Sequence, residues 1–445
     1  MGIKGKIALD HDFLLPQGPT ERFNSPEGLF GWMKENFERY GDIFRATVYG
    51  SVVYVVSAPE YCEHILRRNW VNYPRKGLVV QRIALALGNN LITSNGEAWA
   101  SHRRMIQPAF TKSAIGRWSA MMAGVNAELL QHWGAAAKRR ETVNVTRDVS
   151  LMVLKATLMS IFGEDYDTVA PHFQFFAEEA ARDFKFAQSL VVLRELILRI
   201  VARRRGENTD AADTLGVMMQ ARDRERHEPM ADAQLSREVV NLVVAGHETT
   251  ASLLNWMWYL LASHPESQER LAAELDAAPW EGHPTIDMLQ NYPYTRSVID
   301  EALRLYPPLW LMTRKALNDD RLGEYFVPAG TEIFISPFLI QHSPQLWETP
   351  ERFNPDRLGA DQGSNRPDEL ALCPFGAGPR KCIGELFARV EIQIHLMMFG
   401  KELRLRRCER GVPEITTGIN LLSKHDLHML PEALSKGGRL KSRQD

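Results

Sequence analysis

The sequence predicts a mainly α-helical protein with small β-sheets, folded as a single domain over residues 1–445. Between about residues 58 and 263, apolar residues recur every three or four positions, which is the period of an α-helix. Strand-forming runs at 42–48 and 51–56 flank a short turn. A second β region lies between 314 and 336, in which strands at 323–327 and 331–335 flank the turn sequence Pro328–Gly330. No repeat or low-complexity linker divides the chain. We expect residues 1–25 to be an N-terminal extension and 431–445 a disordered polar tail.

Composition excludes several classes of protein. Hydrophobic residues make up 44% and charged residues 24% of the chain, and the net charge is −2, so neither nucleic acid nor an anionic membrane is indicated as a partner. The four cysteines form no C-x-x-C pair, which favours a reducing compartment. We find neither a signal-peptide pattern nor an apolar run of about 18 residues. The expectation is a cytoplasmic protein with no membrane anchor.

The segment Pro374–Gly384 is the most informative part of the sequence. Its glycines and prolines predict a tight, rigid loop, and a helical pattern follows at once. Cys382 would then lie at a helix N-terminus, where the backbone dipoles favour thiolate over thiol. A thiolate on a rigid loop is a good metal ligand, and Arg380 could pair with a carboxylate of the same cofactor. The alternative is that Cys382 is a small buried apolar residue, as most lone cysteines are.

A second unusual segment interrupts an apolar helix expected from about residue 235 to 263. Ala245–Thr250 places glycine, polar and β-branched residues in the helix middle, where each is unfavourable. Such local violations often mark functional sites. The alternative is a packing kink with Glu248 in solvent.

Two further patterns are weaker in isolation. Glu301 and Arg304 share one face of a helix that must end before Pro307, and such a pair is usually a surface ion pair. Trp99, followed by His102 and Arg103, is by itself most simply a core aromatic residue.

Together these segments resemble the cytochrome P450 family. Phe375, Gly378, Arg380, Cys382 and Gly384 match every fixed position of its haem-binding loop, F-x-x-G-x-R-x-C-x-G. The family's other motifs occur in the expected order: W-x-x-x-R at 99–103, A-G-x-E-T-T at 245–250, E-x-x-R at 301–304 and P-E-R-F at 350–353. The resemblance runs from about residue 30 to 430 and implies the cytochrome P450 fold, in which a long central helix crosses the haem.

The resemblance also implies roles for individual residues. Cys382 would be the axial ligand of a haem b iron, Arg380 would bind a propionate, and Glu248 and Thr249 would deliver protons. Glu301, Arg304 and Arg352 would form a buried ionic triad. The full set expected to bind the cofactor is Trp99, His102, Arg103, Arg314, Phe375, Gly376, Arg380, Cys382 and Gly384.

The function implied is that of a bacterial-type haem-thiolate monooxygenase, which inserts one atom of O2 into a hydrophobic molecule of lipid, terpenoid or polyketide type. The chain has no flavin-binding pattern and no cysteine cluster, so electrons should come from a ferredoxin or flavodoxin with its NAD(P)H-dependent reductase. A peroxide-using or rearranging enzyme and a non-catalytic haem sensor are the alternatives. The presence of both Glu248 and Thr249 argues against them.

Family position suggests a set of apolar residues for the substrate pocket, each of which could instead be ordinary core. They are Val243, Val244, Ala245, Leu309, Leu311, Met312, Ile419 and Leu421.

Overall fold

The computed structural model describes residues 17–20, 28–48, 50–173, 184–207, 211–359 and 369–434. Most of the expected N-terminal extension, and residues 435–445 of the expected tail, lie outside these ranges. The chain divides into two compact units. Unit 1 comprises residues up to 81 with 309–350 and 367–382, and unit 2 comprises 82–308, 351–366 and the chain from 383 onward.

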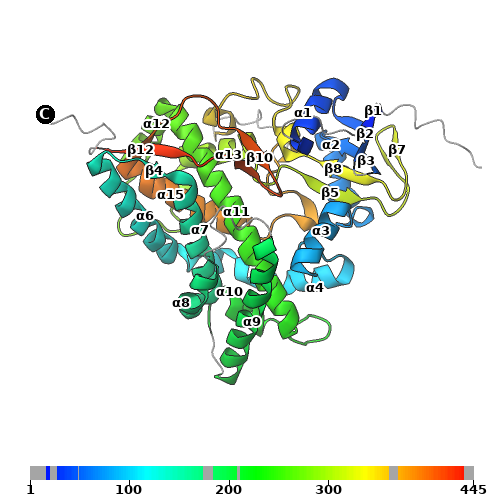
Figure 1. Ribbon diagram of the computed structural model, residues 1–445, viewed down its shortest axis with the longest axis horizontal. Helices are drawn as coiled ribbons and strands as arrows, with labels where there is room; N and C mark the ends of the chain where they lie inside the picture. Colours follow the sequence, from blue (N-terminus) through cyan, green and yellow to red (C-terminus); the bar gives the residue numbers. More distant parts are fainter. Residues whose placement is uncertain are drawn as a thin grey trace, which may run out of the picture. The chain divides into compact units, whose positions relative to one another are not determined.

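Unit 1 is built on a five-stranded sheet of order β1-β2-β3-β8-β5 (Figure 1). Its strands are β1 (Gln17–Thr20), β2 (Ile43–Val48), β3 (Ser51–Val56), β8 (Glu332–Ile335) and β5 (Met312–Lys315). The antiparallel β2–β3 pair confirms the predicted hairpin. The β3–β8 pair is parallel and the β5–β8 pair antiparallel, so the second β region joins the same sheet.

The two strands predicted on either side of Pro328–Gly330 do not pair with each other. β7 (Tyr325–Val327) pairs with β6 (Asp320–Leu322) in a hairpin of its own, and Gly323 occupies its turn with φ +59°. Residues 328–330 therefore connect two separate sheets, and Gly330, with φ +88°, makes the bend.

The helices of unit 1 are short apart from α1 (Gly28–Tyr40). The others within it are α2 (Pro59–Glu63), a π-helical turn (His64–Arg68) and α14 (Pro337–Gln341). α2 and the π-helical turn pack into one apolar core with the sheet, which includes Ile65, Tyr54 and Ile333. α3 (Leu78–Leu87) carries the chain into unit 2.

Unit 2 is mainly helical, as predicted. Its helices are α4 (Gly96–Ile106), α5 (Lys112–Gly116), α6 (Ser119–Arg139), α7 (Val145–Phe162), α8 (Tyr166–Val169), α9 (Phe184–Gly206), α10 (Thr214–Gln220), α11 (Asp232–Ser263), α12 (Pro265–Ala277), α13 (Pro293–Leu305) and α15 (Glu385–Glu402). Its strands are β4 (Val143–Asn144), β9 (Leu403–Arg407), β10 (Ile415–Thr417), β11 (Leu421–Ser423) and β12 (His428–Ala433).

The longest helix, α11, runs for 32 residues and packs along α7 (Figure 1). α7 starts where the Asn144 side chain accepts the N–H of Arg147, and it ends at Gly163, whose φ is +53°. Most of both helices is buried, which explains their nearly continuous apolar sequence. Trp258 of α11, Trp133 and Phe399 meet in an aromatic cluster at the core of the unit.

β12 pairs with β9 as far as Ala433, so the strand extends three residues into the segment expected to be a polar tail. Among the described residues, none of the helices is both long and apolar enough to cross a membrane.

Candidate functional site

The loop before Cys382 is tightly constrained by its glycines. Gly376 and Gly378 have φ of +71° and +67°, a region that favours glycine. A Cβ on Gly378 would lie 2.0 Å from the carbonyl oxygen of Leu66, so no larger residue fits there. The Cys382 N–H donates to the carbonyl of Phe375 at 3.0 Å and closes the loop. The predicted rigid loop is confirmed, and α15 begins three residues later at Glu385.

Among the four cysteines, Cys382 combines exposure with this rigid setting. Cys62 and Cys373 are buried in the apolar core of unit 1. Burial raises the pKa of both thiols, that of Cys373 to about 12, which keeps them protonated. Cys382 and Cys408 are exposed, and Cys408 lies outside the loop. Cys382 is thus the exposed thiol that follows this loop.

Three arginines of unit 1 gather near the same loop. Arg314 is buried, and burial together with the positive charges of Arg75 and Arg380 lowers the pKa of its guanidinium well below the ordinary value. Arg75 also donates to the carbonyl of Arg380 at 3.1 Å, which ties it to the cysteine loop. Arg314 is the buried member of the cluster and Arg75 and Arg380 are half-buried, and a buried charge is costly unless it is paired. This cluster beside an exposed cysteine fits a metal cofactor that carries carboxylates, as haem b does with its two propionates.

Sequence reasoning selected Arg314 and Arg380 but missed Arg75. The residue stands in Tyr73-Pro74-Arg75-Lys76-Gly77, a short stretch with two cations between a proline and a glycine. This pattern is typical of many surface turns, so only the fold reveals that Arg75 lies beside Arg314 and Arg380.

The unusual segment of α11 has two distinct sides. Val243, His247 and Thr250 are buried, whereas Glu248 and Thr249 are half-buried. His247 Nε2 lies 2.9 Å from Ser150 Oγ of α7, and burial lowers the pKa of its ring to about 4, so the ring is neutral. The Thr249 hydroxyl donates to the carbonyl of Ala245 at 2.7 Å. Glu248 accepts a hydrogen bond from the Asn420 side chain at 2.6 Å.

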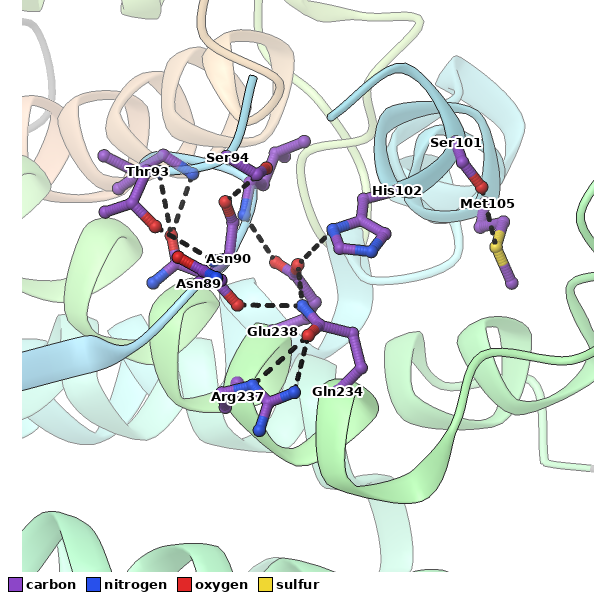
Figure 2. Close-up of polar contacts among 12 residues, drawn as sticks. Asn89, Asn90, Thr93, Ser94, Ser101, His102, Met105, Gln234, Arg237 and Glu238 are labelled. Carbon is purple, nitrogen blue, oxygen red and sulfur yellow. Dashed lines mark hydrogen bonds and ion pairs between the residues drawn. The ribbon is translucent and has the colours of Figure 1, made fainter. Parts of the chain in front are cut away.

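Trp99 is buried and Arg103 is half-buried on α4. His102, which we expected to be a cofactor donor, lies against α11 (Figure 2). Its Nδ1 is 3.0 Å from Oε1 of the fully buried Glu238, close enough for an ion pair but without hydrogen-bond alignment. Glu238 also accepts the Leu91 N–H at 2.9 Å and the Gln234 side chain at 2.7 Å. These contacts tie His102 to protein groups.

The buried ionic triad needs a correction. Glu301 and Arg304 are both fully buried and form the predicted pair, with Arg304 Nε 2.8 Å from Glu301 Oε2. The third cation is Arg357, whose Nε is 3.0 Å from Glu301 Oε1, and not Arg352. The side chain of Arg352 is exposed, and its carbonyl instead accepts hydrogen bonds from Arg304 and Arg357. The triad is therefore Glu301, Arg304 and Arg357.

A second proline–acid–arginine pattern could have revealed this. Pro355-Asp356-Arg357 repeats the Pro350-Glu351-Arg352 spacing five residues later, after Phe353. The side chain of Asn354 caps the turn that carries Arg357 by accepting the N–H of Asp356, and the Asn354 N–H donates to Glu301. This local structure aims Arg357 at the carboxylate.

The expected pocket residues differ in exposure. In unit 2, Val243 and Leu421 are fully buried, and Ile419 is 55% exposed. Val244 and Ala245 of α11 are half-buried. In unit 1, Leu309 and Leu311 are half-buried and Met312 is buried, and the Met312 sulfur lies next to Gly376 of the cysteine loop.

Comparisons with known proteins agree with this geometry. The family model of cytochrome P450 matches residues 21–178 and 166–430. A Streptomyces melanosporofaciens protein named cyclooctat-9-en-7-ol 5-monooxygenase is 30% identical, over 82% of this chain and 83% of its own. The pentalenene oxygenase of Streptomyces avermitilis is 29% identical, over 80% of this chain and 82% of its own. Retinoic-acid-bound cyanobacterial CYP120A1 superposes with a TM-score of 0.83 at 24% identity, covering 94% of this chain and 100% of that one.

The fold and the family match define a haem-thiolate oxidoreductase that incorporates oxygen from O2. The chain belongs to the cytochrome P450 family, whose members carry haem b. The predicted fold class and enzyme class are confirmed. The family also implies a redox partner and a hydrophobic substrate.

Proposed function

We propose that this chain binds haem b through Cys382 and oxygenates a hydrophobic, terpenoid-like molecule with electrons from a separate protein. The observation that carries the proposal is the glycine-constrained loop that presents Cys382, with Arg75, Arg314 and Arg380 clustered near it. This set would supply a thiolate ligand for the haem iron and cations to bind the two propionates. Trp99 and Arg103 of α4 are further candidates for the propionates.

When bound, the haem supplies the activation of O2, and the thiolate of Cys382 favours cleavage of the O–O bond. Proton delivery falls to Glu248 and Thr249. Glu248 is a half-buried carboxyl held by a single described side chain, so it can exchange a proton. Thr249 donates its hydroxyl to the Ala245 carbonyl, and its oxygen can accept a hydrogen bond from a proton donor or a water. A positioned acid of this kind contributes roughly 10²–10⁴-fold to a rate.

A terpenoid substrate is supported by two observations. The candidate pocket residues are all apolar, and a mainly apolar lining is typical of sites for such ligands. Two relatives that share 29–30% identity are named for cyclooctat-9-en-7-ol and pentalenene.

We infer that the electron donor is acidic, as ferredoxins and flavodoxins are. The candidate docking cations are Arg104, Lys112, Lys381 and Arg389. Lys112 pairs with Asp287 at 2.6 Å, and Arg389 pairs with Asp300 and Glu385. Arg104 is exposed, and Lys381 follows the cysteine loop's Arg380. The exposed Arg104 is therefore the candidate to test first. Four cysteines without a disulfide agree with a reducing compartment, and we place the protein in the cytoplasm.

Donor docking can be tested by stopped-flow reduction with a ferredoxin and its reductase at increasing salt. Exposed charges are screened within about 10 Å at 0.1 M salt, so the rate should fall as salt rises. Arg104→Glu should lower the rate at low salt, and Arg139→Glu, an exposed change on α6, is the matched control. A reduction rate that changes neither with salt nor with Arg104→Glu would contradict docking guided by charge.

The oxygenase function is tested by measuring product, hydrogen peroxide and NAD(P)H oxidised together, with pentalenene as the first probe. Wild type should form an oxygenated product from O2 that depends on the donor protein. Thr249→Ala should keep substrate affinity but release more peroxide for each reductant consumed. Product formed from added peroxide alone, with none from O2 and reductant, would favour a peroxide-using enzyme. Binding without any turnover would favour a sensor.

A further inference from the structure

The β10–β11 hairpin is fastened to one face of α11. Ser252 donates to the carbonyl of Leu421 at 2.6 Å, and the Trp256 indole donates to the same oxygen at 3.2 Å. Further along the same hairpin, the Ser423 hydroxyl accepts a hydrogen bond from the Asn255 side chain at 3.0 Å. These helix positions lie four and seven or eight residues after Glu248, so all of them share its side of the helix.

At the turn of this hairpin, Asn420 reaches Glu248. The side chain of Asn420 is 4% exposed, and its Nδ2 donates to Glu248 Oε2 at 2.6 Å. The turn is closed by the Gly418 N–H, which donates to the Asn420 carbonyl at 3.1 Å. A buried amide that is fixed in this way holds the carboxyl in one place.

The other half of the same amide has no partner. Oδ1 of Asn420 is buried and has no hydrogen-bond partner among the described residues. Buried polar atoms are nearly always paired, and each exception calls for an explanation. An amide carries donors on nitrogen and an acceptor on oxygen, so it can serve a carboxyl in both of its protonation states. Nδ2–H can donate to the carboxylate. After a half-turn about the Cβ–Cγ bond, Oδ1 can accept the O–H of the protonated acid.

We propose that Asn420 is a positioning residue that holds the Glu248 carboxyl through both halves of a proton transfer. This inference rests on the proposed relay role of Glu248. In the transfer, the O–H bond of the acid breaks, its proton moves to the reacting oxygen atom, and the carboxylate left behind accepts Nδ2–H. Solvent then returns a proton and the amide turns back. The neighbours of Asn420 in the turn, Ile419 and Leu421, are candidate pocket residues. The same turn would therefore both contact the substrate and position the proton donor.

The test compares two substitutions at Asn420 with a control on the same contact surface. Asn420→Asp keeps the shape but replaces the N–H donors, and Asn420→Leu keeps the size but removes all polarity. Ser252→Ala removes an equivalent hydrogen bond between hairpin and helix without touching Glu248. Each is made in the wild-type and Glu248→Gln backgrounds as haem-loaded enzyme with its donor protein. Pentalenene is the probe, and haem content and absorbance show which variants fold.

We expect both Asn420 variants to lower the product formed per reductant, on the order of tenfold and so less than the full effect of a general acid. Peroxide and the solvent deuterium isotope effect on turnover should rise, and the dissociation constant of the probe should stay the same. In the Glu248→Gln background the same changes should have no further effect. Ser252→Ala should leave the product-to-peroxide ratio unchanged.

Three results would overturn the proposal: an equal loss in the Glu248→Gln background, a matching loss in Ser252→Ala, or Asn420 variants that only weaken probe binding. If Glu248→Gln lowers the product formed per reductant but both Asn420 variants keep the wild-type ratio, the Asn420 inference fails and the relay role of Glu248 stands. If Glu248→Gln itself leaves coupling unchanged, the relay role fails and the inference falls with it.

Discussion

Glu301 and Arg357 lie 56 residues apart in the chain and are joined by a hydrogen bond of 3.0 Å inside unit 2. Arg304 takes the other carboxylate oxygen at 2.8 Å, and the N–H of Asn354 adds a further donor to Glu301. A fully buried carboxylate thus has several partners, which is the condition under which a buried charge is tolerated. The chain from 351 to 358 is fixed to α13 by these contacts.

The first prediction separates Arg357 from Arg352. Glu301→Gln should lower the free energy of unfolding by roughly 3–5 kcal/mol, because Arg304 is left buried without its charge partner. Arg357→Met should destabilise the protein clearly but less, since its side chain is 12% exposed. Arg352→Met should change little, because only its backbone takes part. Urea unfolding followed by circular dichroism measures all three. A greater loss of unfolding free energy for Arg352→Met than for Arg357→Met would support Glu301, Arg304 and Arg352 as the triad.

The second prediction concerns pH and His395. This buried ring accepts the Trp258 indole N–H on Nε2 at 2.8 Å, and its Nδ1 lies 2.7 Å from Asn126 Oδ1, so the neutral tautomer satisfies both partners. Burial lowers its pKa from 6.5 to about 3. The unfolded chain therefore takes up a proton first, and the stability due to the neutral ring is full above pH 6.5 and lost as pH falls toward 3.

The measurement is urea unfolding between pH 7.5 and 5 for wild type and His395→Asn. The stability advantage of wild type should shrink by up to about 1.4 kcal/mol per pH unit below 6.5. His425→Asn, a change at an exposed position, is the control and should leave the pH dependence unaltered. A wild-type advantage that stays constant down to pH 5 would show that the ring is not buried in its neutral form.

The third prediction concerns Arg75 and haem retention. If Arg75 contacts a propionate, Arg75→Leu should speed haem transfer to apomyoglobin roughly tenfold to a hundredfold, because hydrogen bonds to charged groups are worth about 1.5–3 kcal/mol. Arg68→Leu, at a side chain 73% exposed in the same unit, is the matched control. Equal rates of haem transfer for Arg75→Leu and wild type would contradict a contact between Arg75 and a propionate.

Much of the fold could be predicted from periodicity and turn chemistry. The β2–β3 hairpin, the long α11 and the helix after Cys382 each have a local pattern that agrees with their tertiary role. The pairing of β8 with β3 could not be predicted in this way, because the two strands lie almost three hundred residues apart and β-pairing carries no local signal. β7 was not matched with its neighbour β6 for a different reason: Pro328–Gly330 is also a turn sequence, and it suggested a hairpin with the strand that follows.

The residues of the candidate site divide in the same way: some lie in a recognisable local pattern, and others depend on partners far along the chain. The motif that surrounds Cys382 is specific, and its glycines are required by the contact of Gly378 with Leu66. Arg75 and Asn420 were missed because each depends on a partner far along the chain: Arg380 for the first and Glu248 for the second. The Arg352 prediction was wrong because a pattern match alone did not distinguish two arginines five residues apart. The single-domain boundaries and the roles of the individual site residues remain predictions.

The most direct test of the account is the spectrum of the reduced protein with carbon monoxide. Wild type should give the Soret band typical of a thiolate-bound haem. Cys382→Ser should lose that band while still folding, and Cys408→Ser, the other exposed cysteine, should keep it. The buried Cys62 and Cys373 should also be replaceable by alanine without a spectral change. A thiolate-type band that persists in Cys382→Ser would contradict Cys382 as the haem ligand, and with it the central claim.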